Sequence, residues 1–467
     1  MKIGYVNGIL LDGTRDMKPQ HGKIIITEGS KITDVMDKEM AVEQGLYREC
    51  QIVDLNGAYI MPGLINMHTH LPSSGKPARA KKKSDLKKTV RLINSNPLTR
   101  KYAFNMCRDN AETELVSGVT TLRTMGGLND IDSRLRDDIA TGKLQGPRIL
   151  ASNSAISVPG GHMAGSLALE ATSPSEAASM VRQIAASGVD IIKLMVTGGV
   201  LDADELGEPG ALKMDPEIIK AACDEAHRLG YKVSAHAESP KGVKESLKNG
   251  VDYIEHGAEP DEEMIELFKK TGAAHICTIS PTVPYVLGDR KVTGFSEMDQ
   301  KNCRTVMNGI ISCAKACLEN GIPVGLGTDS GCSFTTHYDM WRELVYFSHY
   351  CGVSRNFALH TATAINSQIA GLDKITGTIE PGKSADMVVT EGNPLNDLEA
   401  LRGVYMVVAR GKLIKDPELD KFDQVDKEID RVTSDIRKDT ELHEALERQL
   451  ESLPEDENAV RERIDRR

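Results

Sequence analysis

The residues best suited to chemistry in this sequence stand at the carboxyl ends of short apolar segments. His68 and His70 form an HxH pair that closes the segment at residues 61–68 (MPGLINMH). Residues two apart on an extended chain point to the same side, so both imidazoles can bind one cation. Taken alone, the pair also fits two hydrogen-bonded histidines at a strand end, and only the other polar residues distinguish these interpretations.

Lys193 lies inside the apolar run IIKLMV. An ammonium group with only such neighbours costs free energy unless it is paired or loses its proton. One interpretation is a lysine that reaches the rim of the fold or pairs with a carboxylate. The other is a reactive amine, which could form a Schiff base with a carbonyl compound or a carbamate that bridges two cations.

Three more polar residues close apolar segments further along the chain. These are His236 in VSAHAES, His256 in YIEHGAE and Asp329 in GLGTDSG. Like groups that converge in a dry site repel one another unless a cation satisfies them. The full set of polar strand ends therefore favours a metal site.

The elements that must position these residues alternate between short apolar strands and helical stretches from residue 61 to residue 376. This pattern predicts repeated βα units and, with eight candidate strands, a TIM (β/α)8 barrel whose working residues lie at the carboxyl ends of the strands. The expected strands are 61–68, 119–124, 148–153, 190–195, 232–236, 252–256, 273–280 and 322–329.

The two ends of the chain have a different character from the middle. Residues 1–60 and 377–415 contain short strands separated by Gly, Pro and Asn, which predicts one small composite β-sheet domain of the β-sandwich kind. Residues 416–467 form an acidic tail, in which Leu442, Leu446, Leu450 and Leu453 recur at helical spacing before Pro454. We expect this tail to be either a packed helix or a solvated, disordered segment.

The composition excludes several classes of protein. Of 467 residues, 40% are hydrophobic and 27% are charged, and no run reaches the roughly 18 apolar residues of a membrane span. The formal net charge of −11 disfavours nucleic acid as a partner. Nine cysteines without CxxC spacing fit buried thiols in a reducing compartment, with Cys313 and Cys317 in a helix core. We expect a cytoplasmic protein, with a homo-oligomer as an open possibility.

The motifs MPGLINMHTH, KLMVTGG, HAES, IEHG and GTDSG, in this order, resemble those of the amidohydrolase superfamily. The resemblance covers residues 1 to about 415 and includes GTIEPGKSADMVV. Within the superfamily the sequence is most similar to imidazolonepropionase-related dipeptidases, the group of Xaa-Pro dipeptidases, zinc-dependent arginine carboxypeptidases and ochratoxin-type amidases. This resemblance implies a distorted TIM barrel with a metal-dependent hydrolytic site.

The resemblance also implies a particular ligand set for two divalent cations. The implied ligands are His68, His70 and Asp329 for the more buried metal, His236 and His256 for the more exposed metal, and Lys193 as a carbamate that bridges both. Zinc is the default for mixed imidazole and oxygen ligands, with manganese, cobalt or iron as alternatives. Asp329 is the expected general base, acting on a metal-bridging hydroxide.

Two further residues are candidates for contact with the substrate. His162, in PGGHMAG, resembles a Gly-Gly-His loop of these dipeptidases and could donate to the scissile carbonyl, although a surface loop histidine is the alternative. Glu238, in HAES, departs from the residue types of the Xaa-Pro dipeptidases at that position. It could bind a substrate amine, move protons as in deaminases, or form a structural salt bridge.

These observations favour a metal-dependent amidohydrolase that cleaves a C–N bond in a dipeptide or an N-acyl amino acid. The alternative is a mononuclear deaminase or cyclic-imide hydrolase, which would use Glu238 and leave Lys193 without a role. A Schiff-base aldolase built on Lys193 would leave the histidines and Asp329 unexplained. A non-catalytic metal-binding barrel is a fourth interpretation.

The basic stretch from Lys76 to Arg91 follows the HxH segment. It could attract an anionic substrate, or it could be the solvated face of a helix. A fall in kcat/KM with rising ionic strength would distinguish the first interpretation from the second.

Overall fold

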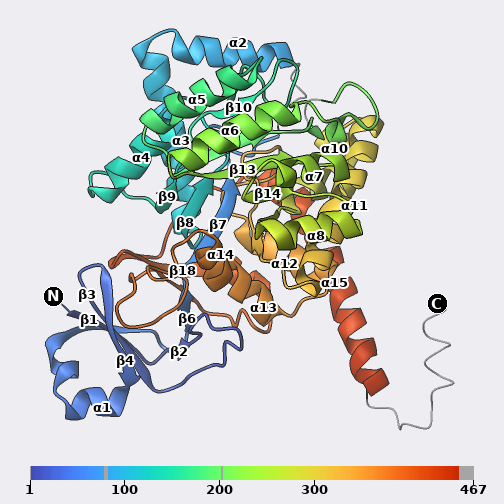
Figure 1. Ribbon diagram of the computed structural model, residues 1–467. Coiled ribbons are helices and arrows are strands. Elements are labelled where there is room, and N and C mark those ends of the chain that lie inside the picture. The colour runs from blue at the N-terminus through green and yellow to red at the C-terminus, as the bar shows by residue number, and fades with distance from the viewer. Residues whose placement is uncertain (1, 78–82, 201–202, 452–467) are drawn as a thin grey trace.

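The computed structural model describes residues 2–77, 83–200 and 203–451 (Figure 1). Its centre is a set of parallel strands, with helices packed outside them. The parallel strands are β7 (Leu64–Thr69), β8 (Val119–Thr124), β9 (Arg148–Leu150), β10 (Ala155–Ser157), β11 (Ala168–Glu170), β12 (Ile191–Met195), β13 (Lys232–Ala237), β14 (Tyr253–His256), β15 (Ala274–Cys277) and β16 (Val324–Leu326).

These strands form two sheets that meet at a seam between β7 and β16. One sheet has the order β7-β8-β9 and the other the order β11-β10-β12-β13-β14-β15-β16. At the seam, Thr69 and Ser330 form a parallel bridge. The backbone amide of Asp329 donates to the carbonyl of His68 at 2.8 Å. This arrangement is an α/β fold consistent with a TIM-like barrel.

Helices lie outside the parallel strands, between successive strands in the sequence, and at the C-terminal end of the chain. They are α2 (Lys83–Asn94), α3 (Pro97–Val116), α4 (Ile131–Ala140), α5 (Pro174–Ala186), α6 (Pro216–Arg228), α7 (Pro240–Lys248), α8 (Glu262–Thr271), α9 (Val283–Val286), α10 (Arg290–Thr293), α11 (Glu297–Glu319), α12 (Met340–Cys351), α13 (Arg355–His360), α14 (Asn366–Ile369) and α15 (Asp423–Glu451). Short helical turns occur at Leu46–Glu49, Glu208–Gly210, Ser280–Thr282, Thr361–Ile365 and Leu398–Gly403. Helix and strand faces share one large apolar core.

Local sequence signals explain where several of these helices begin. Ser173 and Ser239 cap α5 and α7 by accepting a backbone N–H, and a proline follows each cap. Asn96 caps α3 in the same way before Pro97. A capping oxygen satisfies a free amide of the first turn, and proline fits that turn because it has no amide to satisfy.

Strands from both ends of the chain pair with each other at one side of the molecule (Figure 1). One sheet has the order β4-β3-β1-β5 and the other the order β19-β18-β17-β6-β2. Their bounds are β1 (Lys2–Val6), β2 (Ile9–Leu10), β3 (Lys23–Glu28), β4 (Lys31–Asp37), β5 (Cys50–Asp54), β6 (Tyr59–Pro62), β17 (Met387–Thr390), β18 (Val404–Ala409) and β19 (Lys412–Lys415), with helix α1 (Lys38–Glu43) after β4. Side chains of both sheets share an apolar cluster that includes Tyr5, Ile60 and Met387.

The sequence-based strand boundaries need several corrections. Strands β9, β15 and β16 are shorter than the expected 148–153, 273–280 and 322–329. The strand expected at 61–68 is divided, because β6 joins the sheet of the chain ends and only β7 belongs to the parallel strands. The loop expected between the third and fourth strands contains β10 and β11. These three-residue strands lie in a Gly-rich segment, and such short segments give little periodicity to detect.

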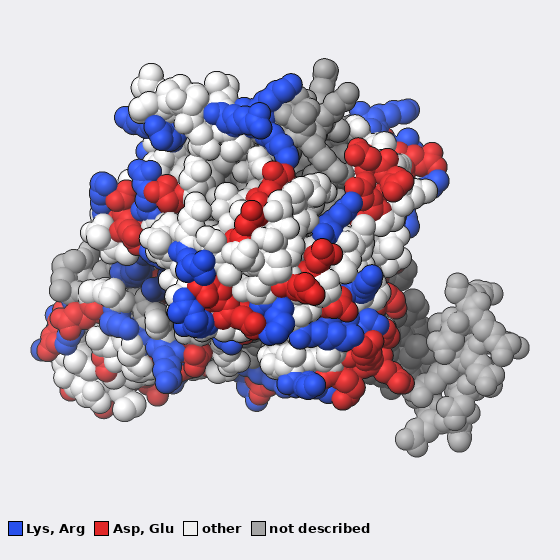
Figure 2. All heavy atoms as spheres, turned by 45° about the horizontal axis from the view of Figure 1, so that its top comes forward, with Lys and Arg blue, Asp and Glu red and all other residues white. Residues whose placement is uncertain are grey.

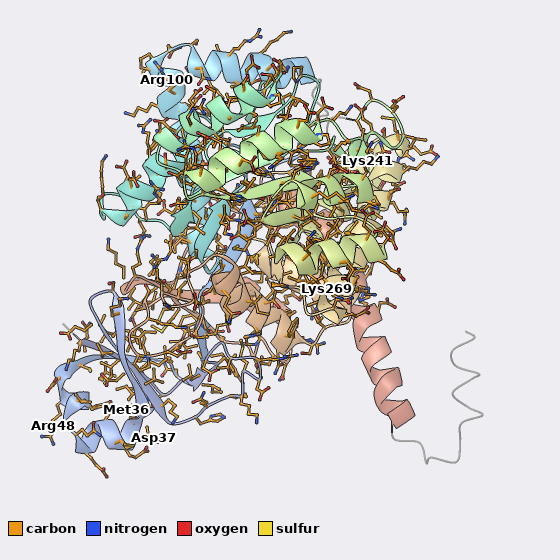
Figure 3. The ribbon with its side chains drawn as sticks, in the orientation of Figure 1. Met36, Asp37, Arg48, Arg100, Lys241 and Lys269 are labelled. Carbon is orange, nitrogen blue, oxygen red and sulfur yellow. The ribbon has the colours of Figure 1, made fainter. Side chains whose placement is uncertain are left out.

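The distribution of charged side chains and the state of the cysteines agree with the expectations from composition. Acidic and basic side chains are interspersed over the face shown in Figure 2. Charged residues such as Arg48, Arg100, Lys241 and Lys269 point outward (Figure 3). All nine cysteines lie in the described ranges and are free thiols, and Cys313 and Cys317 are buried on α11 as predicted. None of the helices in the described ranges is long and apolar enough to span a membrane.

The acidic tail is helical over α15, but the side chains after residue 439 lie outside the described part of the structure. The leucine stripe expected at 442–453 and the residues from 452 onward therefore fall beyond the description. Residues 78–82 of the basic stretch are also outside it.

Candidate metal centre

The candidate metal ligands converge at the carboxyl ends of the parallel strands. His68 is the second-last residue of β7, and His70 directly follows that strand. Asp329 follows β16, on the other side of the seam. The Nε2 atoms of His68 and His70 lie 3.4 and 3.1 Å from the same carboxylate oxygen, Oδ1 of Asp329. The structure thus brings together three side chains that are far apart in the sequence.

Hydrogen bonds determine which nitrogen each of these two imidazoles leaves free. Nδ1 of His68 donates to Glu255 at 2.7 Å, and Nδ1 of His70 donates to the carbonyl of Gly126 at 2.9 Å. In the neutral imidazoles, both Nε2 lone pairs then face Oδ1 of Asp329. Three acceptors that face one another repel unless a proton or a cation lies between them, so this group fits a metal ion.

The pKa shifts show where a proton could compete with the metal. Burial lowers the pKa of His68. For His70, burial lowers the pKa, but the adjacent carboxylate of Asp329 raises it, and the net shift is upward. Burial alone would raise the pKa of Asp329, but the surrounding histidines hold it well below its usual range. A proton on His70 therefore competes with a cation at low pH.

His236 on β13 and His256 on β14 provide a second pair of imidazoles. Nδ1 of His256 is 2.8 Å from Oγ1 of Thr278, and Nε2 of His236 donates to the carbonyl of Gly198 at 3.0 Å. Burial, followed by neighbouring cationic groups, lowers the pKa of both histidines well below the usual value. Both are therefore neutral at physiological pH, which is the state that binds a metal.

At this centre, the possible ligand atoms form two overlapping groups. One group is His68, His256 and Asp329, and the other is His236, Glu238 and His256. Within each group the ligand atoms lie within 4.8 Å of one another. Because His256 belongs to both, the two groups are adjacent and fit two neighbouring cations.

Lys193 occupies the middle of β12 and is buried, with 1% of its surface exposed. Within the described ranges, no residue forms a hydrogen bond with its Nζ atom. Burial lowers the pKa of this amine to about 8, although Glu255 and Asp329 act in the opposite direction. A buried amine without a partner is unusual, and it fits a group that is modified or ligated in the working protein.

Two buried charged residues behind the centre were missed in the sequence. Glu255 accepts from His68 and also pairs with Arg123 at 2.5 Å, and Ser234 donates to it at 2.5 Å. Arg123 and Glu255 each interrupt an apolar strand, VTTLRT and DYIEH. That is the same signal that identified Lys193, and it could have identified this pair.

His162 and Glu238, the two candidate substrate contacts, both lie beside His236. The ring of His162 stacks on that of His236, with 4.3 Å between centroids and 15° between planes. Oε2 of Glu238 is 3.8 Å from Nε2 of His236. His162 is partly exposed to solvent, whereas His236 is buried.

The backbone is strained at two of the candidate ligands. His256 has φ of 70° and Asp329 has φ of 55°, in the left-handed region that disfavours residues with a side chain. Strained conformations of this kind concentrate at functional sites, where the surrounding structure imposes them. The strain therefore supports a functional role for these strand ends.

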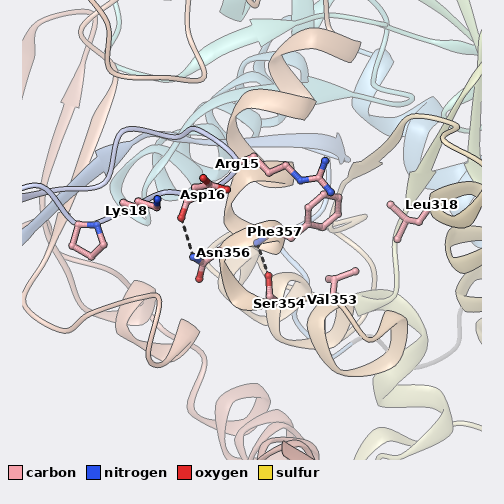
Figure 4. A pocket seen from close by; sticks show the side chains of 9 residues that line it. Arg15, Asp16, Lys18, Leu318, Val353, Ser354, Asn356 and Phe357 are labelled. Atoms are coloured by element: carbon pink, nitrogen blue, oxygen red, sulfur yellow. Dashed lines mark hydrogen bonds between the residues drawn. The ribbon is translucent and has the colours of Figure 1, made fainter.

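A surface groove elsewhere on the molecule is separate from this centre. It has a volume of about 770 Å³ and is lined by residues that include Arg15, Lys18, Leu318 and Phe357 (Figure 4). Arg15 lies over the ring of Phe357. None of the lining residues belongs to the candidate metal centre.

The sequence pattern of the amidohydrolase family matches residues 59–414. The chain therefore belongs to the amidohydrolase family and is a hydrolase that acts on carbon–nitrogen bonds. The predicted resemblance to this superfamily and to its dipeptidase-like group is confirmed.

Three known proteins illustrate the similarity. A candidate prolidase from Bifidobacterium longum is 35% identical, covering 92% of this chain and 98% of its own, with a TM-score of 0.79. A Xaa-Pro dipeptidase solved with methionine in its active site is 27% identical, covering 89% of this chain and all of its own, with a TM-score of 0.73. Ochratoxinase from Aspergillus niger is 26% identical over 331 residues, which are 65% of this chain and 67% of that protein.

A fourth protein has a different activity. A 5-methylthioadenosine/S-adenosylhomocysteine deaminase from Moorella thermoacetica is 27% identical over 226 residues, which are 43% of this chain and 50% of that enzyme. The family membership therefore does not by itself select a substrate.

Proposed function

We propose that this amidohydrolase hydrolyses the amide bond of a dipeptide or an N-acyl amino acid at a binuclear metal centre in a distorted TIM barrel. The observation that carries the proposal is the pair of adjacent ligand groups that share His256, next to the buried and unpartnered amine of Lys193. A mononuclear site gives Lys193 no role. The dipeptidase and ochratoxinase similarities support the same class of substrate.

The proposed ligands divide between a more buried and a more exposed position. The more buried cation would be held by His68, His70 and Asp329, the more exposed one by His236 and His256, and both by Lys193 as a carbamate. Imidazole and carboxylate ligands suit zinc, manganese, cobalt or iron, and zinc is the first choice. When bound, the cations supply Lewis acidity that polarises an amide carbonyl and lowers the pKa of a water molecule.

Side chains of the protein would transfer the protons of the reaction and form hydrogen bonds with the substrate. The carboxylate of Asp329 has a strongly lowered pKa, so it is available to accept a proton from water and pass it to the departing amine. His162, stacked on His236, would donate to the scissile carbonyl oxygen as negative charge develops there. In a dipeptide substrate, Glu238 would bind the free α-amine as a charge-assisted partner.

A second candidate function is hydrolytic deamination or cyclic-imide hydrolysis at a single metal. Glu238 favours it, because the ligand atom of this carboxylate lies within 4.8 Å of those of His236 and His256 and could move protons to a leaving amine. The similarity to a deaminase supports it as well.

We further propose that residues 1–60 and 377–415 form one small domain, that residues 61–376 form the barrel, and that the protein acts in the cytoplasm on small molecules. The pairing of β6 with β17 supports the first part, since it joins the two chain ends in one sheet.

A substrate screen tests the proposed function. The metal-loaded protein is assayed with matched libraries of dipeptides, N-acyl amino acids, adenosine-type amines and cyclic imides. We expect turnover in the first two libraries, and we expect Asp329→Asn to abolish it without unfolding the protein. Turnover confined to the last two libraries would contradict the proposal and favour the deaminase or imide hydrolase.

A further inference from the structure

Helix α15 lies beyond the part of the chain that matches the family pattern, which ends at residue 414. Its first half packs on the body of the protein beside α12 (Figure 1). Val425, Ile429, Val432 and Ile436 recur at helical spacing, and each is at most 6% exposed. This part of the tail therefore packs into the apolar core of the fold.

The start of this helix contacts the loop that carries Asp329. The backbone amide of Phe422 donates to Oη of Tyr338 at 2.9 Å, and that hydroxyl donates to Asp426 at 3.1 Å. Tyr338 stands at the end of the loop that begins after β16 and leads into α12. One hydroxyl thus joins the tail to the loop of the proposed general base.

The next turn of the helix contacts the loop that follows β15. Glu428 accepts from the backbone amide of Asp289 at 2.7 Å and pairs with Arg431 at 2.7 Å. Arg431 in turn donates to the carbonyl of Leu287 at 3.3 Å. A buried carboxylate that accepts from a main-chain amide is a charge-assisted hydrogen bond, which holds the loop in a defined position.

Buried aromatic side chains connect the segments that follow β15 and β16. Tyr285 stacks on Phe295, with centroids 3.5 Å apart, and Phe295 contacts Phe334 edge-on at 6.3 Å. Tyr285 lies on α9, in the segment between β15 and α11, and Phe334 lies in the loop after β16. A displacement of one loop would therefore be transmitted to the other.

The loop after β7 joins the same assembly. The ammonium group of Lys76 lies 4.5 Å from the ring centroid of Phe422, and the amide of Phe334 donates to the carbonyl of Gly75 at 2.9 Å. The segment from Phe422 to Arg431 therefore contacts the loops that follow β7, β15 and β16. Two of these strands deliver His68, His70 and Asp329.

We propose that the segment Phe422–Arg431, here called the C-terminal brace, positions the substrate-binding loops of this enzyme. The residues of the brace act through the loops and do not contact the reacting atoms. The inference rests on the proposed function only in assuming that these loops contact the substrate.

The test compares two ion pairs on the same helix. Glu428→Ala removes the contact with the loop after β15. The control, Arg437→Ala, removes the ion pairs with Asp397 and Glu399. These two acidic residues lie at the start of the helical turn Leu398–Gly403 and not in the loops that follow β7, β15 or β16. A third variant, Glu428→Gln, keeps an acceptor for the amide of Asp289.

We expect Glu428→Ala to raise KM about tenfold, the effect of losing one charge-assisted hydrogen bond, with kcat within about twofold and metal content unchanged. Arg437→Ala should leave KM unchanged even where it lowers Tm, and Glu428→Gln should restore KM to within about threefold of the wild type. An unchanged KM in Glu428→Ala, or equal changes in both alanine variants, would overturn the proposal.

A second readout needs no substrate and separates this inference from the proposed function. Amide hydrogen exchange is measured over residues 283–294 and 330–338 in the same variants. We expect Glu428→Ala to accelerate exchange there at least fivefold and Arg437→Ala to leave it unchanged. Should the wild type cleave no dipeptide or N-acyl amino acid, the function would fail while this result still decides the role of the brace. Equal exchange in wild type and Glu428→Ala would refute it.

Discussion

At the level of single residues, the partner of each histidine determines which of its nitrogens can bind a metal. Glu255 and the carbonyl of Gly126 hold the protons of His68 and His70 on Nδ1, so that Nε2 is free on the side of Asp329. Oγ1 of Thr278 lies 2.8 Å from Nδ1 of His256 and can accept a hydrogen bond from it in the same way. Such outer partners fix the tautomer and the ring orientation, and they contribute to metal affinity without touching the metal.

The contribution of Thr278 can be measured with a variant of nearly equal shape. Thr278→Val removes the oxygen that accepts from His256, so we expect metal affinity to fall about tenfold with the fold retained. Thr282→Val is a matched control, since Thr282 is also buried but donates to the carbonyl of Ile279. Chelator competition gives both affinities, and equal values for the two variants would contradict the role of Thr278.

The pH dependence of carbamate formation follows from the environment of Lys193. Only the neutral amine adds carbon dioxide, and burial lowers the pKa of this lysine to about 8. At a fixed concentration of dissolved carbon dioxide, carbamate formation in metal-free protein should rise about tenfold per pH unit below pH 8 and level off above it. The rate of carbon-dioxide-dependent metal uptake measures this. A rise that continues through pH 9 would indicate an ordinary lysine.

At the level of elements, the sequence predicted the bounds of some parallel strands more closely than those of others. Strands β8 and β12 to β14 lie within one residue of their expected bounds, whereas β7 and β16 differ from theirs by up to three residues. Strands β10 and β11 could not be predicted, since three residues among glycines have no detectable period. The contact of Asp329 with His68 and His70 could be expected from topology, but its distances depend on the seam between β7 and β16.

This seam depends on a glycine. A Cβ atom on Gly327 would lie 2.6 Å from the backbone nitrogen of His68, which is too close for any side chain. We therefore expect Gly327→Ala to separate β7 from β16, to lower metal affinity and to destabilise the fold by roughly 1–3 kcal/mol. Gly403→Ala is the control, because its Cβ would meet open space. Metal titration and thermal unfolding of both variants test this, and an unchanged affinity in Gly327→Ala would count against it.

At the level of the whole molecule, charge and composition left the acidic tail undecided between a helix and a disordered segment. The deciding feature is tertiary, because Arg342 is buried and binds Asp339 and Asp430, and its NH1 donates to Thr433. The sequence shows the acidic residues but not the buried guanidinium that requires them. Pairing of this kind explains how an acidic segment packs within a chain whose formal net charge, tail included, is −11.

The basic stretch leads to a prediction about salt. Lys87 on α2 pairs with Glu170 at 2.8 Å. Part of the positive charge of the basic stretch is therefore already neutralised within the protein. We expect kcat/KM for an anionic substrate to change less than about twofold between low and high ionic strength, which is the outcome for a solvated helix face. Stopped-flow or steady-state rates measure this. A steep fall with salt for anionic but not neutral substrates would show that the stretch attracts the substrate.

The most direct test of the binuclear centre is the metal content of the wild type and of Lys193→Ala, purified without chelators and with bicarbonate present. Elemental analysis should find about two equivalents per chain in the wild type, and at most one in the variant with activity reduced by at least about a thousandfold. A wild type with a single equivalent, or a variant that keeps both full metal content and activity, would contradict a centre bridged by Lys193.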